Sequence, residues 1–164
     1  MTPIVLVDEL VKFIRQVVKE FVLNSNVTGI KKEPQVIGGY LGEKKPGQDQ
    51  NPPDYPYVVV RYLEDEDNGQ QDTAIVRIIA GTYSEEAADG WRDALNVLTR
   101  IKHALLKQKF FGPFKVEYPV KMELPEEQPF PEWVALMTVN VVIPRTEEEG
   151  GYLEDVFAQG QTGS

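Results

Sequence analysis

Three segments of the sequence form predicted strands with apolar side chains on both faces, and this feature constrains the fold more than any other. They cover residues 57–63, 73–81 and 132–143. In the first two segments the apolar residues occupy alternate and intervening positions alike, and Arg61 and Arg77 are their charged residues. An antiparallel sheet with one solvated face normally shows polar residues on that face. Both faces of this sheet therefore need a cover.

Two amphipathic helices are predicted as the cover of one face. Apolar residues recur at helical spacing in residues 3–23 and 84–109. Thr2 and Pro3 suit the start of the first helix, and Ser84 is expected to begin the second. The predicted apolar stripes consist of Leu6, Leu10, Phe13, Ile14, Val17 and Phe21 in the first helix, and of Trp91, Ala94, Leu95, Leu98, Ile101 and Leu105 in the second.

The remaining elements complete an α+β pattern. Asn68-Gly69 is typical of a hairpin turn, so the first two strands are expected to pair across an acidic turn. Residues 34–41 predict a short strand, and residues 114–124 predict an edge strand because Pro119 lacks an amide donor. The order of elements predicts a single α+β domain over residues 1–144, a mainly antiparallel sheet with two principal helices packed on one face.

Two segments are expected to stay outside the packed domain. Residues 42–56 contain four prolines and two glycines with almost no apolar side chains, which predicts a mobile loop, either a linker or a segment that orders on a partner. Residues 145–164 are rich in Glu and Gly and predict a flexible acidic C-terminal tail.

Composition excludes several functional classes. The 164-residue chain contains no cysteine, which excludes disulfides and thiolate metal sites. Its net charge of −9 disfavours a surface that binds the phosphates of a nucleic acid. Asp8 and Lys12 interrupt the N-terminal apolar stretch, which argues against a signal peptide or a membrane span there. We expect a soluble, intracellular protein without specific nucleic-acid binding.

No pattern in the sequence predicts catalysis. His103 is the single histidine and falls on the polar side of the second predicted helix. The run Glu64–Asp67 could hold a hard cation, but it lacks the spacing of a calcium loop, and hydrated carboxylates that protect a strand edge are the simpler interpretation. The chain has no glycine-rich phosphate loop and no serine nucleophile motif. We therefore expect no enzyme activity, no cofactor and no metal site.

The second apolar face predicts an interaction surface, because a large exposed apolar patch usually binds a partner. The alternative is that the tail, the proline-rich loop or the second helix folds over this face. The residues predicted to contact a neighbouring subunit or partner are Val59, Arg61, Ile75, Arg77, and Pro46, Pro52 and Pro53 of the loop.

Two runs of the sequence, "YPYVVVRYLEDEDNGQQDTAIVRIIAGTYSEEAADGWRDALNVLTRIKHALL" and "PEWVALMTVNVVIP", carry a resemblance to a known family. A P-x-V-x-V strand at Pro56–Val60 and an acidic turn precede a second strand, Ile75–Tyr83, that ends in G-x-Y. A helix containing Asp93–Ile101 and a late aromatic strand, Trp133–Val139, follow. Over roughly residues 4 to 144 the chain resembles tail terminator, or tail completion, proteins of long-tailed bacteriophages and related prophages.

The resemblance implies a structural protein. Such proteins assemble, usually as a hexameric ring, on the head-proximal end of the tail tube, end its polymerisation and provide the surface that joins the head. The implied partners are further copies of the chain, the tail tube protein and a head-tail connector protein, with DNA passing through the ring. The implied location is the virion tail, and the host cytoplasm during assembly. The alternative function is a neck or head-completion adaptor that binds a connector partner as a monomer or dimer.

Overall fold

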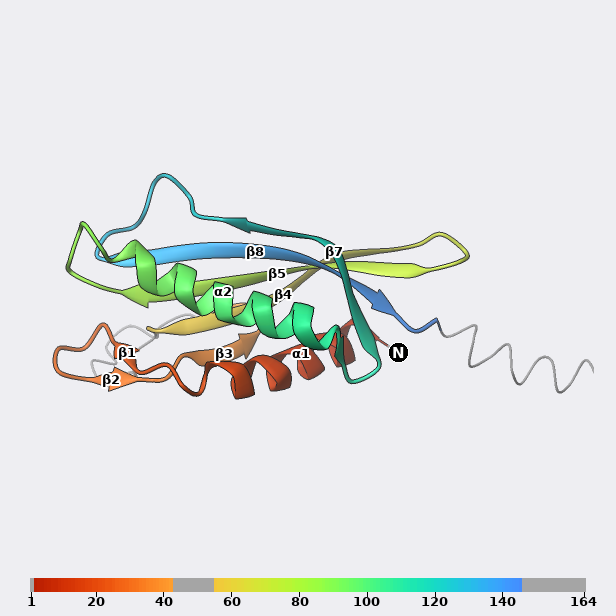
Figure 1. Ribbon diagram of the computed structural model, residues 1–164, viewed down its shortest axis with the longest axis horizontal. Helices are drawn as coiled ribbons and strands as arrows, with labels where there is room; N and C mark the ends of the chain where they lie inside the picture. Colours follow the sequence, from red (N-terminus) through yellow and green to blue (C-terminus); the bar gives the residue numbers. More distant parts are fainter. Residues whose placement is uncertain (1, 43–54, 146–164) are drawn as a thin grey trace, which may run out of the picture.

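A six-stranded sheet and two helices make up most of the molecule, which confirms the predicted α+β class (Figure 1). The computed structural model describes residues 2–42 and 55–145. In chain order the elements are α1 (Pro3–Val18), β1 (Leu23–Asn24), β2 (Lys31–Lys32), β3 (Gln35–Gly38), β4 (Tyr57–Asp67), β5 (Asp72–Tyr83), α2 (Trp91–Gln108), β6 (Phe110–Phe111), β7 (Phe114–Glu123) and β8 (Glu132–Ile143).

The sheet places its most apolar strands at the centre. The strand order is β3-β4-β5-β8-β7-β6, and β1 and β2 form a separate two-stranded hairpin. β3 runs parallel to β4, whereas the other neighbours in the large sheet are antiparallel. β8 is the last strand in the sequence but lies between β5 and β7. A central position suits β8 because its side chains are apolar on both faces.

Both helices contribute to one core with the same face of the sheet. In β8 the odd-numbered side chains from Trp133 to Ile143 are buried, whereas the even-numbered ones are half-buried. The side chains that share the main core are Leu6, Leu10, Val11, Ile14 and Val18 of α1, Ala94, Val97, Leu98, Ile101 and Leu105 of α2, and Val58, Val60, Val76, Ile78, Met137, Val139 and Val141 of the central strands. We call this side of the sheet the helix face.

α1 begins as predicted and ends earlier. The Thr2 Oγ1 accepts a hydrogen bond of 3.2 Å from the amide of Val5, and Pro3 occupies the first turn. The helix ends at Val18, whereas the apolar periodicity predicted that it continues to residue 23. Phe21 still packs against the main core from outside the helix, which explains why the apolar pattern continues after the helix ends.

α2 begins at Trp91, so the expectation that Ser84 starts this helix is wrong. The backbone of Ser84 instead bonds to the β7–β8 connection and to β8: its amide donates to the Pro131 carbonyl at 2.9 Å, and its carbonyl accepts from the Trp133 indole at 3.0 Å. Tertiary hydrogen bonds thus override a local capping signal. The buried stripe of α2 includes Val97, whereas Trp91 is 37% exposed.

The acidic run Glu64–Asp67 lies in β4, not in the turn as predicted. The turn consists of residues 68–71, in which Gly69 adopts a φ of 89°. The strands extend further than their composition indicates. β8 pairs with β5 as far as Asp72, and β5 in turn pairs with the acidic end of β4 as far as Asp67. This end of the hairpin projects past both helices (Figure 1).

The position of Pro119 agrees with the predicted edge strand. β6 pairs only with the first two residues of β7, so the rest of β7 has β8 as its one partner among the described strands. The β7–β8 register shifts between Glu117 and Lys121, around the proline that cannot donate a ladder hydrogen bond.

Gly90→Ala is expected to destabilise the fold, because a Cβ at residue 90 would lie 2.3 Å from the Trp133 Nε1. The indole would have to move and lose its bond to the Ser84 carbonyl, at a cost of about 1–3 kcal/mol. Thermal unfolding measures this loss as a lower Tm. Gly42→Ala is the matched control, because nothing lies within 4 Å of its Cβ position. Equal Tm values for the two variants would show that the close contact between Gly90 and the Trp133 indole does not stabilise the fold.

Candidate interaction surface

The face of the large sheet opposite the helices, which we call the outer face, carries the predicted interaction residues. Arg61 pairs directly with Arg77 across β4 and β5, and the next outer-face pair toward the hairpin end is Glu64 with Ile75. In the three central strands the outer face comprises Tyr57, Val59, Arg61, Glu64 and Glu66 of β4, Thr73, Ile75, Arg77 and Ile79 of β5, and Val134, Leu136, Thr138, Asn140 and Val142 of β8. In β7 it carries Lys115, Glu117, Lys121 and Glu123.

One part of the outer face is already closed. Val59 is 1% exposed and forms a small buried cluster with Tyr57 and Ile79. Tyr55, Val134 and Leu136 pack against this cluster. The prediction that Val59 contacts a neighbouring subunit or partner is therefore wrong, because the single chain already buries this side chain.

Gly81 makes this closure possible, and the sequence analysis missed its role. It pairs with Tyr57 across β4 and β5, and the tyrosine ring occupies the space that a side chain would need. A Cβ at residue 81 would lie 2.2 Å from the Tyr57 Cζ. A glycine opposite an aromatic residue in a predicted hairpin is the signal that could have indicated this arrangement.

Arg61 and Arg77 lie next to each other on the outer face, and their guanidinium groups differ in how they are hydrogen-bonded. Like charges directly opposite on neighbouring strands repel each other. Arg61 is held by its Nε bond of 3.1 Å to the Gly39 carbonyl and by the Tyr40 ring, whose centroid lies 4.1 Å from the guanidinium carbon. The Nε of Arg77 is buried and has no hydrogen-bond partner among the described residues. A further acceptor would satisfy this group.

The same row of the sheet continues with Thr138 and Lys121. The Lys121 Nζ lies 2.7 Å from the Glu123 carboxylate. The bond from Lys121 lowers the pKa of Glu123, and Arg77 adds a smaller attraction. Lys121 is thus paired within the chain, and Lys115 lies in a different row, beside Val142. We call the directly opposed Arg61 and Arg77 the cationic centre of the outer face.

The projecting end of the hairpin carries carboxylates on both faces. On the helix face Asp65 accepts a hydrogen bond from the Tyr62 hydroxyl, and Arg145 pairs with Asp67. Burial raises the pKa of Asp72 to about 6, with a further contribution from a hydrogen bond to Asp65. On the outer face Glu64 and Glu66 are exposed.

Ile75 pairs with Glu64 in the row next to the arginine pair. It lines a shallow cavity of about 240 Å³ together with Glu64, Glu66, Asn68, Gln71, Thr73 and Asn140. The side chain of Ile75 is half-buried, so a partner could bury it further. Of the predicted contact residues in β4 and β5, Arg61, Ile75 and Arg77 therefore remain accessible.

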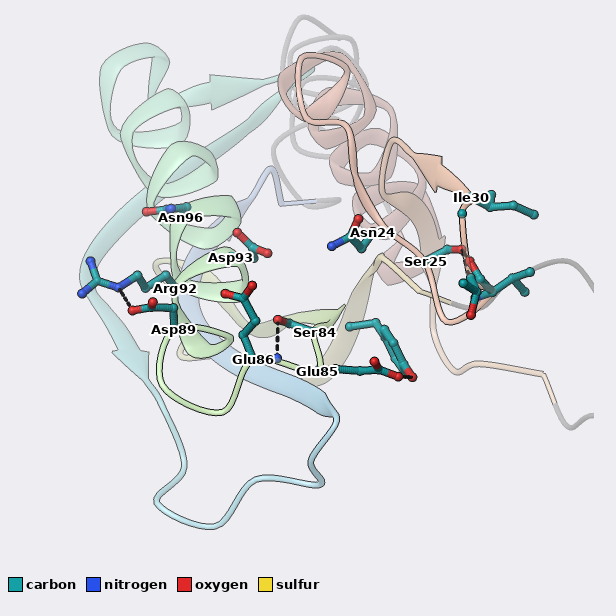
Figure 2. Close-up of a pocket in the computed structure, with 14 residues that line it drawn as sticks. Asn24, Ser25, Ile30, Ser84, Glu85, Glu86, Asp89, Arg92, Asp93 and Asn96 are labelled. Atoms are coloured by element: carbon teal, nitrogen blue, oxygen red, sulfur yellow. Dashed lines mark hydrogen bonds and ion pairs between the residues drawn. The ribbon is translucent and has the colours of Figure 1, made fainter.

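A polar cleft of about 630 Å³ lies at the opposite end of the fold, between the β1–β2 hairpin and the start of α2 (Figure 2). Glu85, Glu86, Asp89 and Asp93 line it. Burial raises the pKa of Asp93, and the nearby Glu86 raises it further. Arg92 also lines the cleft, and its Nε lies 3.1 Å from the Asp89 carboxylate.

The described residues that line the cleft do not pair a nucleophile with a base that could activate it. Ser84 bonds through its Oγ to the amide of Glu86, and no histidine or lysine that could activate a nucleophile lines the cleft. His103 is exposed on α2. Within residues 2–42 and 55–145, no group of three or more His, Cys, Asp or Glu side chains could hold a metal ion.

The predicted loop contacts Pro46, Pro52 and Pro53 lie outside the described residues, as does the predicted tail from residue 146 onward. In the described part of the chain, neither helix has the length and apolar character that crossing a membrane requires.

A scan against protein-family models finds no match to this chain, and a search of curated proteins finds no relative.

Asp72→Asn is expected to remove a pH dependence of stability. The folded chain holds the Asp72 proton more tightly than the unfolded chain, because its pKa is raised to about 6 from 3.8. Stability from this group is present below pH ~4 and is lost as the pH rises through about 6. At pH 7 the variant should therefore be more stable than the parent by about 1 kcal/mol after solvent screening.

Urea unfolding at pH 4, 5, 6 and 7 measures this difference. Glu66→Gln is the matched control, since it removes a carboxylate from the outer face of the same hairpin. A difference between Asp72→Asn and the parent that stays constant across these pH values would contradict the assignment.

Proposed function

We propose that the chain is a phage tail assembly protein that caps the head-proximal end of the tail tube. Its sequence pattern supports this proposal through the resemblance to tail terminator proteins. The structural observation that supports it is the cationic centre of the outer face, where Arg77 lies opposite Arg61 with a buried Nε that lacks an acceptor among the described residues. A buried donor without an acceptor costs free energy, which a carboxylate of a partner would recover.

The proposed assembly is a hexameric ring of this chain between the tube protein and a head-tail connector protein. Arg61, Ile75 and Arg77 supply contacts with a neighbouring subunit or with the tube, and a carboxylate of that partner satisfies Arg77. No reaction is part of this function. The net charge of −9 suits a ring through which DNA passes without being held.

Capping of tail tubes tests the proposal. The purified chain is added to polymerising tail tube protein from the same genome, and tube lengths are measured by electron microscopy. We expect shorter tubes that carry a ring of six copies at one end. Tubes that elongate equally with and without the chain would refute the proposal. A single copy bound to a connector protein instead would favour the adaptor function.

Ile75→Asp is expected to abolish capping and to leave the fold intact, because the half-buried side chain faces away from the helices. Circular dichroism monitors the fold, and tube length measures capping. Val22→Asp is the matched control, since Val22 is an apolar residue that is 64% exposed far from the hairpin end in sequence. Capping by Ile75→Asp at the level of Val22→Asp would exclude the outer face as the contact surface.

A further inference from the structure

A groove of about 340 Å³ lies where the start of α1 meets the end of β3 and the middle of β4. Ile4 and Val7 of α1, Gly38 of β3 and Tyr62 of β4 contribute to its lining. Val7 packs closely on Gly38, since an added Cβ at residue 38 would lie 2.8 Å from the Val7 Cγ1. Ile4 and Tyr40 also line the groove, and they are 73% and 71% exposed. The groove thus presents large apolar side chains that the described residues do not cover.

The chain leaves the described fold on the same face of the sheet as this groove. Ile143 at the end of β8 is buried in the main core, and the buried Arg145 pairs with Asp67 on the helix face. α1 packs on that face too. The start of α1 and the end of β8 both lie toward the end of the molecule from which the hairpin projects (Figure 1).

The C-terminal segment that follows Arg145 is long enough to reach the groove. Asp67, the partner of Arg145, and Tyr62, which lines the groove, are five residues apart in β4, or about 17 Å. The seven residues 146–152 span up to about 23 Å when extended. Residue 153 can therefore enter the groove of its own chain while the described fold stays as it is.

The sequence of this segment supplies apolar side chains for the groove. Tyr152, Leu153, Val156 and Phe157 follow a spacer of three glutamates and two glycines. Residues 43–54 also lie outside the described residues and follow Tyr40 closely in the chain, but proline is their one apolar residue type. The free energy gained by burying apolar surface therefore favours the C-terminal segment as the occupant.

Charge also suits an acidic segment in this position. Glu154 and Asp155 stand between the apolar residues of the segment. Arg61 lines the groove, and the first turn of α1 contains no acidic residue, so the amino end of this helix can attract carboxylates. Asp8 is the opposing charge in the lining, and it lies one turn of α1 beyond Ile4.

We propose that residues 152–157 dock in this groove of the same molecule. Their apolar side chains cover Ile4 and Tyr40, and Glu154 and Asp155 lie toward Arg61 and the amino end of α1. The inference concerns the free chain and does not rest on the proposed function.

A cysteine pair tests the placement, because the chain contains no cysteine of its own. Ile4→Cys/Leu153→Cys is expected to form a disulfide within one molecule under mild oxidation. Lys115→Cys/Leu153→Cys is the matched control. Lys115 is exposed and pairs with Val142, three residues before Arg145, so a segment that is merely tethered meets it at least as often as it meets Ile4. Mass spectrometry of the oxidised monomer measures both rates.

Faster oxidation of the Ile4 pair than of the Lys115 pair supports docking. Equal rates would overturn the proposal, because they would indicate a tethered segment without a docking site. A covalent dimer as the main product of Ile4→Cys/Leu153→Cys would also overturn it, since a second copy would then supply the segment.

Access to the groove tests the chemistry in the full chain. On an Ile4→Cys background, Leu153→Asp/Phe157→Asp should raise the alkylation rate of the thiol at least about three-fold, because a short linker holds the parent segment at about mM effective concentration. Gln159→Asp/Thr162→Asp adds the same charge at polar positions and should leave the rate unchanged. The same tail variants on a Val22→Cys background control for general reactivity, since Val22 is 64% exposed away from the groove.

An alkylation rate that Leu153→Asp/Phe157→Asp does not change refutes docking, and so does an equal increase with Gln159→Asp/Thr162→Asp. Circular dichroism confirms that each variant is folded. Tube capping is measured separately. A chain that caps tubes with an uncovered groove leaves the proposed function standing, and one that covers the groove but never caps leaves only the docked segment.

Discussion

The pairing of β5 with two full-length neighbours is the interaction on which the rest of the structure depends. β5 pairs with β8 from Asp72 to Tyr83 and with β4 over nearly the same length. Side chains alternate along a strand, so a slip of one residue would turn Arg77 toward the helices and Val76 toward the outer face. The core of the helix face penalises that slip, because it would bury a charge without a partner. The same register therefore builds the core and places the arginines outside.

The two faces of this sheet are closed by different means. The helices cover the helix face with aliphatic stripes from α1 and α2. On the outer face, the Tyr57 ring lies over Gly81 and closes a smaller cluster around Val59. That closure stops at the row of Arg61 and Arg77, where charge replaces the aromatic cover. The outer face is thus closed around Val59 and accessible from the row of Arg61 and Arg77 toward the hairpin end.

Charge is divided between the faces of the projecting hairpin. On the helix face Asp67 pairs with Arg145 and Asp65 accepts from the Tyr62 hydroxyl, whereas Asp72 keeps one buried oxygen without a partner among the described residues. On the outer face Glu64 and Glu66 are exposed near Arg77, whose Nε has no acceptor among the described residues. The β-bulge between Tyr62 and Glu64 produces this division, because it resets which residues of the acidic run face each side. One bulge therefore places Asp65 and Asp67 on the helix face and Glu64 and Glu66 on the outer face.

Regular periodicity determined much of the fold. The helical spacing of Leu6, Leu10 and Ile14 predicted α1, and the apolar alternation of residues 73–81 predicted β5 as a two-sided strand. Both predictions rest on residue spacing within a single helix or strand, which does not depend on contacts with distant parts of the chain. The α+β class and the side of the sheet on which Arg61 and Arg77 lie could be predicted for the same reason.

Only the tertiary structure decided where elements end and which side chains remain accessible. Ser84 carries a capping signal, yet hydrogen bonds to Pro131 and Trp133 delay α2 until residue 91. Val59 and Ile75 look equivalent in the sequence, but Val59 belongs to the buried cluster that includes Tyr57 and Ile75 does not. Burial depends on neighbours that are distant in the chain, and so does the missing acceptor of Arg77. The sequence by itself determined which residues share a face, and packing between strands determined which of them a partner can reach.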